Sequence, residues 1–160
     1  MRDRFLADSV VSLLAREPTA RVAILAHNGH VQRTPVVWGT YLSAYPMGSY
    51  LAAALGDGYV AIGTTSTGER TSEMALDPST EVGFRVVDAK LEAPQEGSFE
   101  AALQAAGLAG QLTLMPLRGA PPNVFTSLRA QSGYLTTDVT AAYDAIITLP
   151  RFTAQRDLGF

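Results

Sequence analysis

The chain has 160 residues, of which 47% are hydrophobic and 17% are charged, and its formal net charge is −3. This length and apolar content predict one domain, residues 1–160, with a filled core, and they argue against intrinsic disorder. The weak negative charge argues against nucleic acid as a partner, because no stretch is basic enough to follow a phosphate backbone. Cysteine is absent, which excludes disulfides, thiolate metal sites and thiol nucleophiles.

The N-terminal region has the pattern of an amphipathic helix over residues 3–16, which Pro18 would stop. Its expected buried face carries residues at spacings of three and four, namely Phe5, Leu6, Ser9, Val10, Leu13 and Leu14. The region mixes both charge signs, and no apolar run of the chain is long enough to cross a bilayer. We therefore expect a cytoplasmic protein without a membrane partner.

A short apolar run over residues 21–26 is typical of a buried strand, and it leads directly into His27-Asn28-Gly29-His30. These two histidines are the only ones in the sequence. An Asn-Gly pair favours a tight turn with positive φ, and the first and fourth residues of such a turn lie close together. We therefore expect both imidazoles in one small volume at the carboxyl end of a strand, where open α/β sheets bind ligands.

The rest of the chain predicts helices that alternate with short strands. The expected order is a long connection over 28–45, a helix over 46–55 ended by Gly56, a strand over 59–65, an irregular segment over 66–80, a strand over 81–87, a helix over 99–106 capped by Ser98, a strand over 112–115, a loop over 118–123 and a strand over 145–149. Strands linked by a helix form a β-α-β crossover, which predicts an α/β fold with a mainly parallel sheet and helices on both faces. Thr65 would then lie at the same sheet edge as His27.

Two adjacent imidazoles suit the hydrolysis of an ester, because one can act as a base near neutral pH while the other stabilises a developing oxyanion. We assign His27 to activating water or substrate and His30 to orientation or oxyanion stabilisation. Asn28 and Thr65 are the expected substrate-binding residues. The alternative is purely structural: Asn28-Gly29 is then only a turn, and the histidines cap strand ends.

Other chemistries are less well supported by the residue pattern. A metal site would need a third ligand, and the candidates Glu69, Glu73 and Asp88 lack a diagnostic spacing, so we expect no metal and no cofactor. No Gly-x-Ser-x-Gly elbow, dinucleotide fingerprint or phosphate-binding loop is present. Trp38 and Tyr41 either pack the long connection or contact an apolar ligand.

The order of several short motifs resembles the erythromycin esterase family. The segments that carry the resemblance are Arg2-Asp-Arg-Phe-Leu-Ala7, Ala26-His-Asn-Gly-His30, Met47-Gly-Ser-Tyr-Leu51, Gly56-Asp-Gly-Tyr-Val-Ala-Ile-Gly63, Gly97-Ser-Phe-Glu100, Leu117-Arg118 and Tyr143-Asp-Ala-Ile-Ile147. One departure is that residues 114–118 contain no acidic residue, where similar sequences tend to have one.

The resemblance implies an ester hydrolase that opens a macrolactone with histidine-activated water and that serves in antibiotic resistance, with His27 and His30 in the cleft. It also implies that the chain corresponds to the C-terminal part of such a hydrolase, because the family's principal histidine and its glutamates belong to an N-terminal half. The expected partners are a small macrolide-like ester and either that missing N-terminal half or a second copy in a homo-dimer. The alternative function is a non-catalytic half-domain that binds a ligand or the complementary half.

Overall fold

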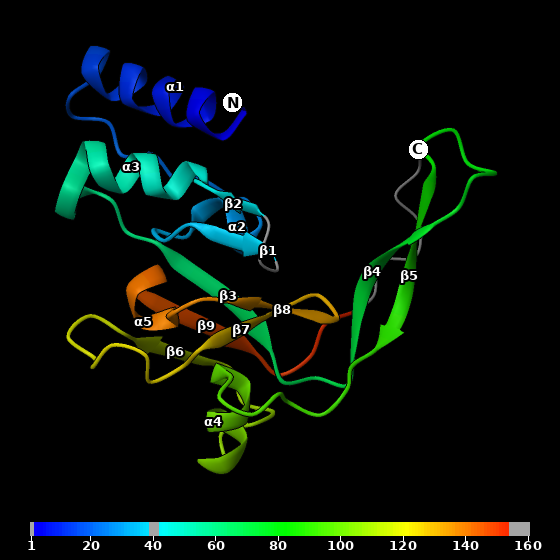
Figure 1. Cartoon of the computed structure of the whole chain (residues 1–160). Helices are drawn as coiled ribbons and strands as arrows, with labels where there is room; N and C mark the ends of the chain where they lie inside the picture. Colours follow the sequence, from blue (N-terminus) through cyan, green and yellow to red (C-terminus); the bar gives the residue numbers. More distant parts are fainter. Residues whose placement is uncertain (1, 39–41, 154–160) are drawn as a thin grey trace.

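The computed structural model of the chain describes residues 2–38 and 42–153 (Figure 1). The helices are α1 (Arg2–Arg16), α2 (Asn28–Val31), α3 (Met47–Leu55), the 3-10 turn η1 (Gly56–Gly58), α4 (Phe99–Ala105) and α5 (Val139–Ala142). The strands are β1 (Val36–Trp38), β2 (Leu42–Ala44), β3 (Ile62–Ser66), β4 (Arg70–Leu76), β5 (Phe84–Lys90), β6 (Thr113–Pro116), β7 (Ser127–Ala130), β8 (Gly133–Thr136) and β9 (Ala145–Leu149).

The central sheet has three strands in the order β3-β9-β6. Strand β3 is parallel to β9, with Ile62 opposite Ala145, whereas β6 is antiparallel to β9. The other three strand pairs, β1–β2, β4–β5 and β7–β8, are antiparallel and two-stranded. The fold is therefore a mixture of α and β, and the predicted mainly parallel sheet with helices on both faces is not confirmed.

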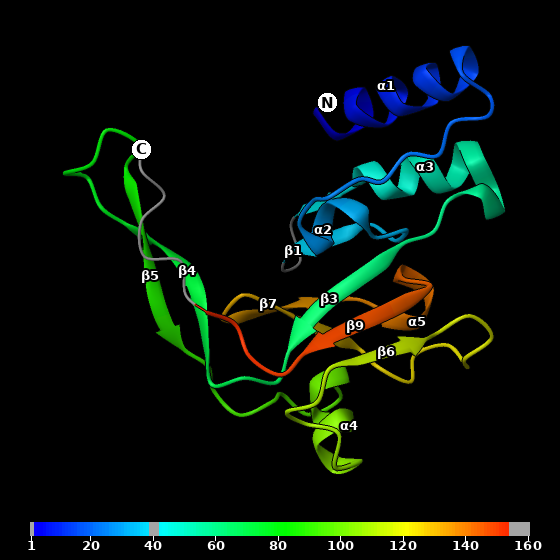
Figure 2. The same ribbon diagram turned by 180° about the vertical axis from the view of Figure 1, so that it is seen from behind.

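Residues 21–26 are extended, but they pair with no strand of the described part of the chain, so the predicted first strand is wrong. An apolar run becomes a sheet strand only where a neighbour takes up its backbone hydrogen bonds. Figure 2 shows this run passing over α3. Leu25 within it is fully exposed. The β-α-β crossover that depended on this strand is consequently absent.

Local helix signals are confirmed by the structure. Pro46 precedes α3, and Gly56 ends it with a φ of 54°, which a residue with a side chain rarely adopts. The Ser98 hydroxyl accepts a hydrogen bond from the backbone N–H of Ala101 at 3.1 Å and caps α4. Each of these signals involves residues only a few positions apart, so the sequence suffices to predict them.

Helix α1 forms as predicted, but only part of its expected buried face meets the core. Ala7 is buried, and Val10 and Val11 pack against the core cluster, whereas Phe5 is 69% exposed. Helix α1 lies on α3, as both views show (Figures 1 and 2). The small side chain of Ala7 suits the close approach of two helices, which hydropathy spacing alone does not reveal.

The segment over 66–80, expected to be irregular, contains β4. Strand β4 pairs with β5 over seven residues, and their hairpin projects away from the rest of the molecule (Figures 1 and 2). The outer side chains of this hairpin are largely exposed, including Leu76 at 91%. Pairing with β5, which local composition does not reveal, makes this segment a strand. The hairpin β7–β8 and the short helices α2 and α5 were not predicted.

The core lies where α3, α4 and α5 meet the central sheet. Its fully buried side chains are Leu51, Phe99, Leu103, Leu128, Val139, Tyr143 and Ile146. The ring of Phe125 stands edge-on to that of Phe99, with the ring centroids 5.0 Å apart. This core supports β3, whose end faces the histidine-bearing helix α2.

Candidate functional site

The two histidines lie on one turn of helix rather than on a tight turn of positive φ. His27 is the N-cap of α2, and its Nδ1 accepts a hydrogen bond from the backbone N–H of Gly29 at 3.1 Å. His30 lies one turn further on, and its backbone N–H donates to the carbonyl of His27 at 2.8 Å. Residues three apart on a helix face the same side, so the two histidines share one helical turn, whereas the expected turn of positive φ is wrong.

Asn28 fixes this helical turn to the central sheet. Its amide nitrogen donates to the carbonyl of Thr64 at 2.6 Å, and its amide oxygen accepts from the backbone N–H of Thr64 at 3.0 Å. The side chain thus satisfies the backbone N–H and C=O of Thr64 as a neighbouring strand would. Asn28 is 7% exposed, and this pair of hydrogen bonds makes it a positioning residue for both histidines.

His30 is paired with a carboxylate from the first turn of α1. The Oδ2 of Asp3 lies 2.6 Å from Nδ1 of His30, and it also accepts from the backbone N–H of Met47 at 3.1 Å. Burial acts to raise the pKa of Asp3, but the hydrogen bonds from His30 and Met47 outweigh burial and lower it. Asp3 therefore remains a carboxylate that holds Nδ1–H of His30 and also caps the first turn of α3.

The other ring nitrogen of His30 is an acceptor. Its Nε2 lies 3.2 Å from the guanidinium of Arg2, and a guanidinium can only donate. The tautomer of His30 that fits both contacts has its proton on Nδ1 toward Asp3 and a lone pair on Nε2. A carboxylate that orients a histidine in this tautomer is the arrangement of a general base.

His27 has the opposite tautomer. Because its Nδ1 accepts from Gly29, the proton of the neutral ring is on Nε2. Burial, and to a lesser degree the nearby His30, lowers the pKa of His27. A neutral His27 therefore offers an N–H donor, which suits a carbonyl oxygen that gains negative charge.

A small cavity of about 150 Å³ lies beside His27. Its lining residues include Asn28, Thr64, Thr65, Arg129 and Gln131. Thr65 is 2% exposed, and its hydroxyl donates to Oε1 of the buried Glu100. The structure thus brings together His27, Asn28 and Thr65, which the sequence analysis had placed in one site, whereas His30 faces Asp3.

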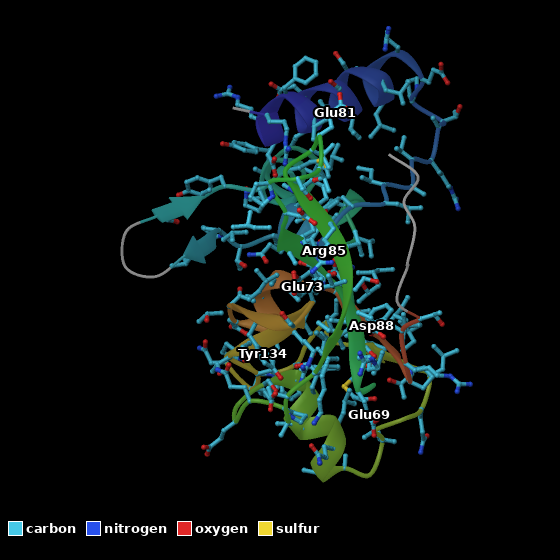
Figure 3. The ribbon with its side chains drawn as sticks, turned by 90° about the vertical axis from the view of Figure 1, so that its right-hand side faces the viewer. Glu69, Glu73, Glu81, Arg85, Asp88 and Tyr134 are labelled. Carbon is cyan, nitrogen blue, oxygen red and sulfur yellow. The ribbon has the colours of Figure 1, made fainter. Side chains whose placement is uncertain are left out.

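The acidic residues considered for a metal site lie elsewhere. Glu69, Glu73 and Asp88 are spread along the β4–β5 hairpin (Figure 3). Asp88 is paired with Arg70 at 2.8 Å, and Glu73 accepts from the backbone N–H of Ser132 at 3.1 Å. Among residues 2–38 and 42–153, no cluster of three His, Asp or Glu side chains could hold a metal ion. The side chain of Trp38 and all of Tyr41 lie outside the described residues.

Sequence reasoning missed three residues near the histidines: Asp3, Glu100 and Arg129. Asp3 is separated from His30 by 27 residues along the chain, and Glu100 is separated from Thr65 by 35. Both acids belong to motifs that carry the family resemblance, which is the signal that points to them. Arg129 belongs to no such motif and is found only from its burial.

Comparison with known proteins identifies several relatives. The erythromycin esterase family model matches residues 1–152. Two proteins of Escherichia coli, erythromycin esterase type II and erythromycin esterase type I, are 32% identical over 154 residues and 34% identical over 149 residues. These matches cover 94% and 92% of this chain, but only 36% of each relative. The chain thus spans little more than a third of their length.

Solved structures agree with this result. A mutant of the erythromycin esterase EreC in its open conformation superimposes with a TM-score of 0.85 at 32% identity, covering 98% of this chain and 38% of that one. A succinoglycan biosynthesis protein gives a TM-score of 0.63 at 20% identity, covering 92% of this chain and 37% of that one, and it shows a shared fold alone.

Proposed function

The chain belongs to the erythromycin esterase family, and from that premise we propose that it contributes the histidine site of a hydrolase that opens a carboxylic ester. The proposed substrate is a macrolide lactone, because the relatives are named for erythromycin. The observation that carries the proposal is the pairing of Asp3 with Nδ1 of His30 at 2.6 Å, which leaves Nε2 of His30 as a base.

In the proposed reaction, Nε2 of His30 removes a proton from water as the water oxygen attacks the acyl carbon. Asp3 stabilises the imidazolium that forms, since its carboxylate already accepts Nδ1–H. His27 donates Nε2–H to the carbonyl oxygen. The bond from the acyl carbon to the alkoxy oxygen then breaks, and His30 returns its proton to that oxygen. This assignment reverses the roles expected from the sequence.

Arg2 occupies the position at Nε2 of His30 that the reacting water would take. However, the side chain of Arg2 is 74% exposed. A contact of this kind contributes little, because the long side chain loses entropy and solvent screens its charge. Water can therefore replace Arg2 at small cost. Arg2→Ala should accordingly retain hydrolysis, unlike substitution of either histidine.

The test is hydrolysis of erythromycin by the purified chain, followed by mass spectrometry as the addition of one water to the lactone. His30→Ala and His27→Ala should each lower the rate at least about 100-fold, the order of effect of a general base or an oxyanion donor. Circular dichroism checks that both variants fold, and Arg2→Ala is the matched control. Full activity in both histidine variants would refute the site.

The alternative is a half-domain that binds a ligand but is not catalytic by itself. The short span relative to the named esterases is compatible with it. In that case the chain would bind erythromycin in calorimetry, and neither the unmodified chain nor the histidine variants would release product. Hydrolysis by the isolated chain would exclude this alternative.

A further inference from the structure

Arg129, in β7, is a buried cation whose guanidinium is only partly hydrogen-bonded. It is 5% exposed, and its guanidinium is held from two sides. One nitrogen, Nη2, donates to the carbonyl of Glu92 at 2.9 Å, and the ring of Tyr134 lies 5.0 Å from the guanidinium carbon. The other two nitrogens, Nε and Nη1, are buried without any acceptor among the described residues.

The nearest buried acid does not supply that acceptor. Glu100 is fully buried, but its Oε1 accepts from the backbone N–H of Arg129 at 3.1 Å and from the hydroxyl of Thr65. No ion pair joins the two side chains in the described part of the chain, and Oε2 of Glu100 is itself unpartnered. Buried donors without acceptors are costly and uncommon, so the guanidinium is expected to donate to an acceptor from outside the chain.

Arg129 is one of the residues that line the small cavity beside His27. This cavity has a volume of about 150 Å³, and no acidic side chain is among the lining residues. His27 contributes a second donor, because its Nδ1 is occupied by Gly29 and its proton is on Nε2. Two donors in a cavity without an acid favour an anionic oxygen over a cation.

We propose that this cavity is a carboxylate subsite, in which Arg129 receives the acyl oxygens of the ester and of the acid product. The inference rests on the proposed function, because ester hydrolysis converts a neutral carbonyl into a carboxylate. A cavity of this volume admits a carboxyl group and a few carbons but not a whole macrolide, so it determines how the acyl end is oriented. Arg129 is thereby a specificity-determining residue.

The test compares two small ligands of nearly equal shape by calorimetry with the full chain. Propionate carries the charge of the product, and propionamide is its neutral control. Propionate should bind at least about tenfold more tightly, since hydrogen bonds to charged groups are the stronger ones. It should shift the NMR signals of the Thr65 and Ala130 amides and of the His27 ring. Equal binding of the two ligands, or no binding, would overturn the proposal.

Variants separate Arg129 from other cations. Arg129→Gln should abolish the preference for propionate and Arg129→Lys should retain part of it, whereas Arg85→Gln, on the exposed hairpin, should change nothing (Figure 3). If Arg129→Gln does not fold, the site of the NMR shifts in the unmodified chain decides the question. Shifts confined to the hairpin arginines would refute the subsite.

A competition assay identifies the source of the carboxylate. Competitive inhibition of erythromycin hydrolysis by propionate would assign the subsite to the ester's own acyl group. Binding without inhibition would refute that assignment. A chain that binds propionate through Arg129 but hydrolyses no ester would refute the proposed function and leave the carboxylate-binding site standing. Hydrolysis without a preference for propionate would refute the subsite alone.

Discussion

His27 and His30 are three positions apart, yet their hydrogen bonds place the proton on opposite nitrogens. Gly29 donates to Nδ1 of His27, whereas Asp3 accepts from Nδ1 of His30. One ring is therefore a donor through Nε2 and the other an acceptor through Nε2. The backbone of one helical turn and one carboxylate from α1 suffice to give two chemically identical side chains different roles.

Asp3→Asn tests this division of roles. An amide in place of the carboxylate can still accept from Met47, but it no longer stabilises an imidazolium at His30. We expect erythromycin hydrolysis to fall about 10- to 100-fold, the range seen when a group that orients a functional histidine is lost. Asp8→Asn, in the exposed pair with Arg4 on the same helix, is the control and should leave the rate unchanged. An unaltered rate and pH profile in Asp3→Asn would show that Asp3 only joins helices.

The lowered pKa of His27 predicts a pH effect on stability. The folded chain holds the ring neutral where the unfolded chain, with an ordinary histidine pKa of 6.5, begins to bind a proton. Stability should therefore fall as the pH drops below that value and toward the lowered pKa of the folded state. Urea unfolding between pH 7 and pH 5 should show a shallower loss in His27→Gln than in the unmodified chain, and equal slopes would contradict the prediction.

At this scale, sequence reasoning found the residues that local chemistry distinguishes. His27 and His30 are the only histidines, and their neighbours Asn28 and Gly29 mark a turn. Asp3, Glu100 and Arg129 look like ordinary charged residues until the fold brings them to Thr65 and the histidines. Their contribution depends on long-range contacts and burial, which spacing along the chain does not encode.

At the scale of elements, α2 is held by a close backbone approach to α3. A Cβ atom built on Gly48 would lie 2.2 Å from the carbonyl oxygen of Val31, which is backbone and cannot rotate away. Gly48→Ala would improve the helix propensity of α3 by about 1 kcal/mol, but displacing α2 should cost about 3 kcal/mol or more. We expect net destabilisation in urea unfolding. Gly58→Ala, whose Cβ would meet nothing nearer than 3.8 Å, is the control and should change stability by less than about 0.5 kcal/mol.

Asp144 ties three elements together next to the core. Its carboxylate accepts from the backbone N–H of Ala61 at 2.7 Å, from Arg33 at 2.8 Å and from Arg118 at 2.7 Å. These hydrogen bonds lower the pKa of Asp144 against the opposing effect of burial. Asp144→Ala should reduce the free energy of unfolding by about 3 kcal/mol, because Arg33 loses its carboxylate partner and the backbone N–H of Ala61 loses its acceptor. Arg118→Ala, which removes a half-exposed partner, should cost less than about 1 kcal/mol in the same denaturant series. Equal losses would contradict this ranking.

Elements with local signals were predictable, and elements that depend on partners were not. Ser98 predicts the start of α4 and Gly56 predicts the end of α3, each from residues only a few positions apart. Strand β9 was found because residues 145–149 are apolar and bounded by Pro150. Residues 21–26 look equally apolar, but no described strand lies beside them to form a sheet. Strand β4 escaped notice because its pairing with β5, rather than its own composition, makes it a strand.

The whole molecule has an open apolar groove of about 740 Å³ between α1, residues 20–26, α3 and β3. No helix in the described part of the chain is long and apolar enough to span a membrane. The lining of the groove includes Leu25, which is fully exposed, and Val60 and Ile62, which are 55% and 44% exposed. Exposed apolar surface of this extent is a liability in water, and the adjacent edge of β3 carries backbone groups that a further strand would pair.

This surface predicts that the isolated chain associates with itself at high concentration. Sedimentation velocity should show species larger than a monomer, and Leu25→Ser should shift them toward monomer. Because Leu25 is fully exposed, the same substitution should change the free energy of unfolding by less than about 0.5 kcal/mol. Leu76→Ser, 91% exposed on the projecting β4–β5 hairpin, is the matched control, because it removes an equal side chain far from the groove. A chain that stays monomeric throughout, or that responds to Leu76→Ser instead, would show that the groove is tolerated in water.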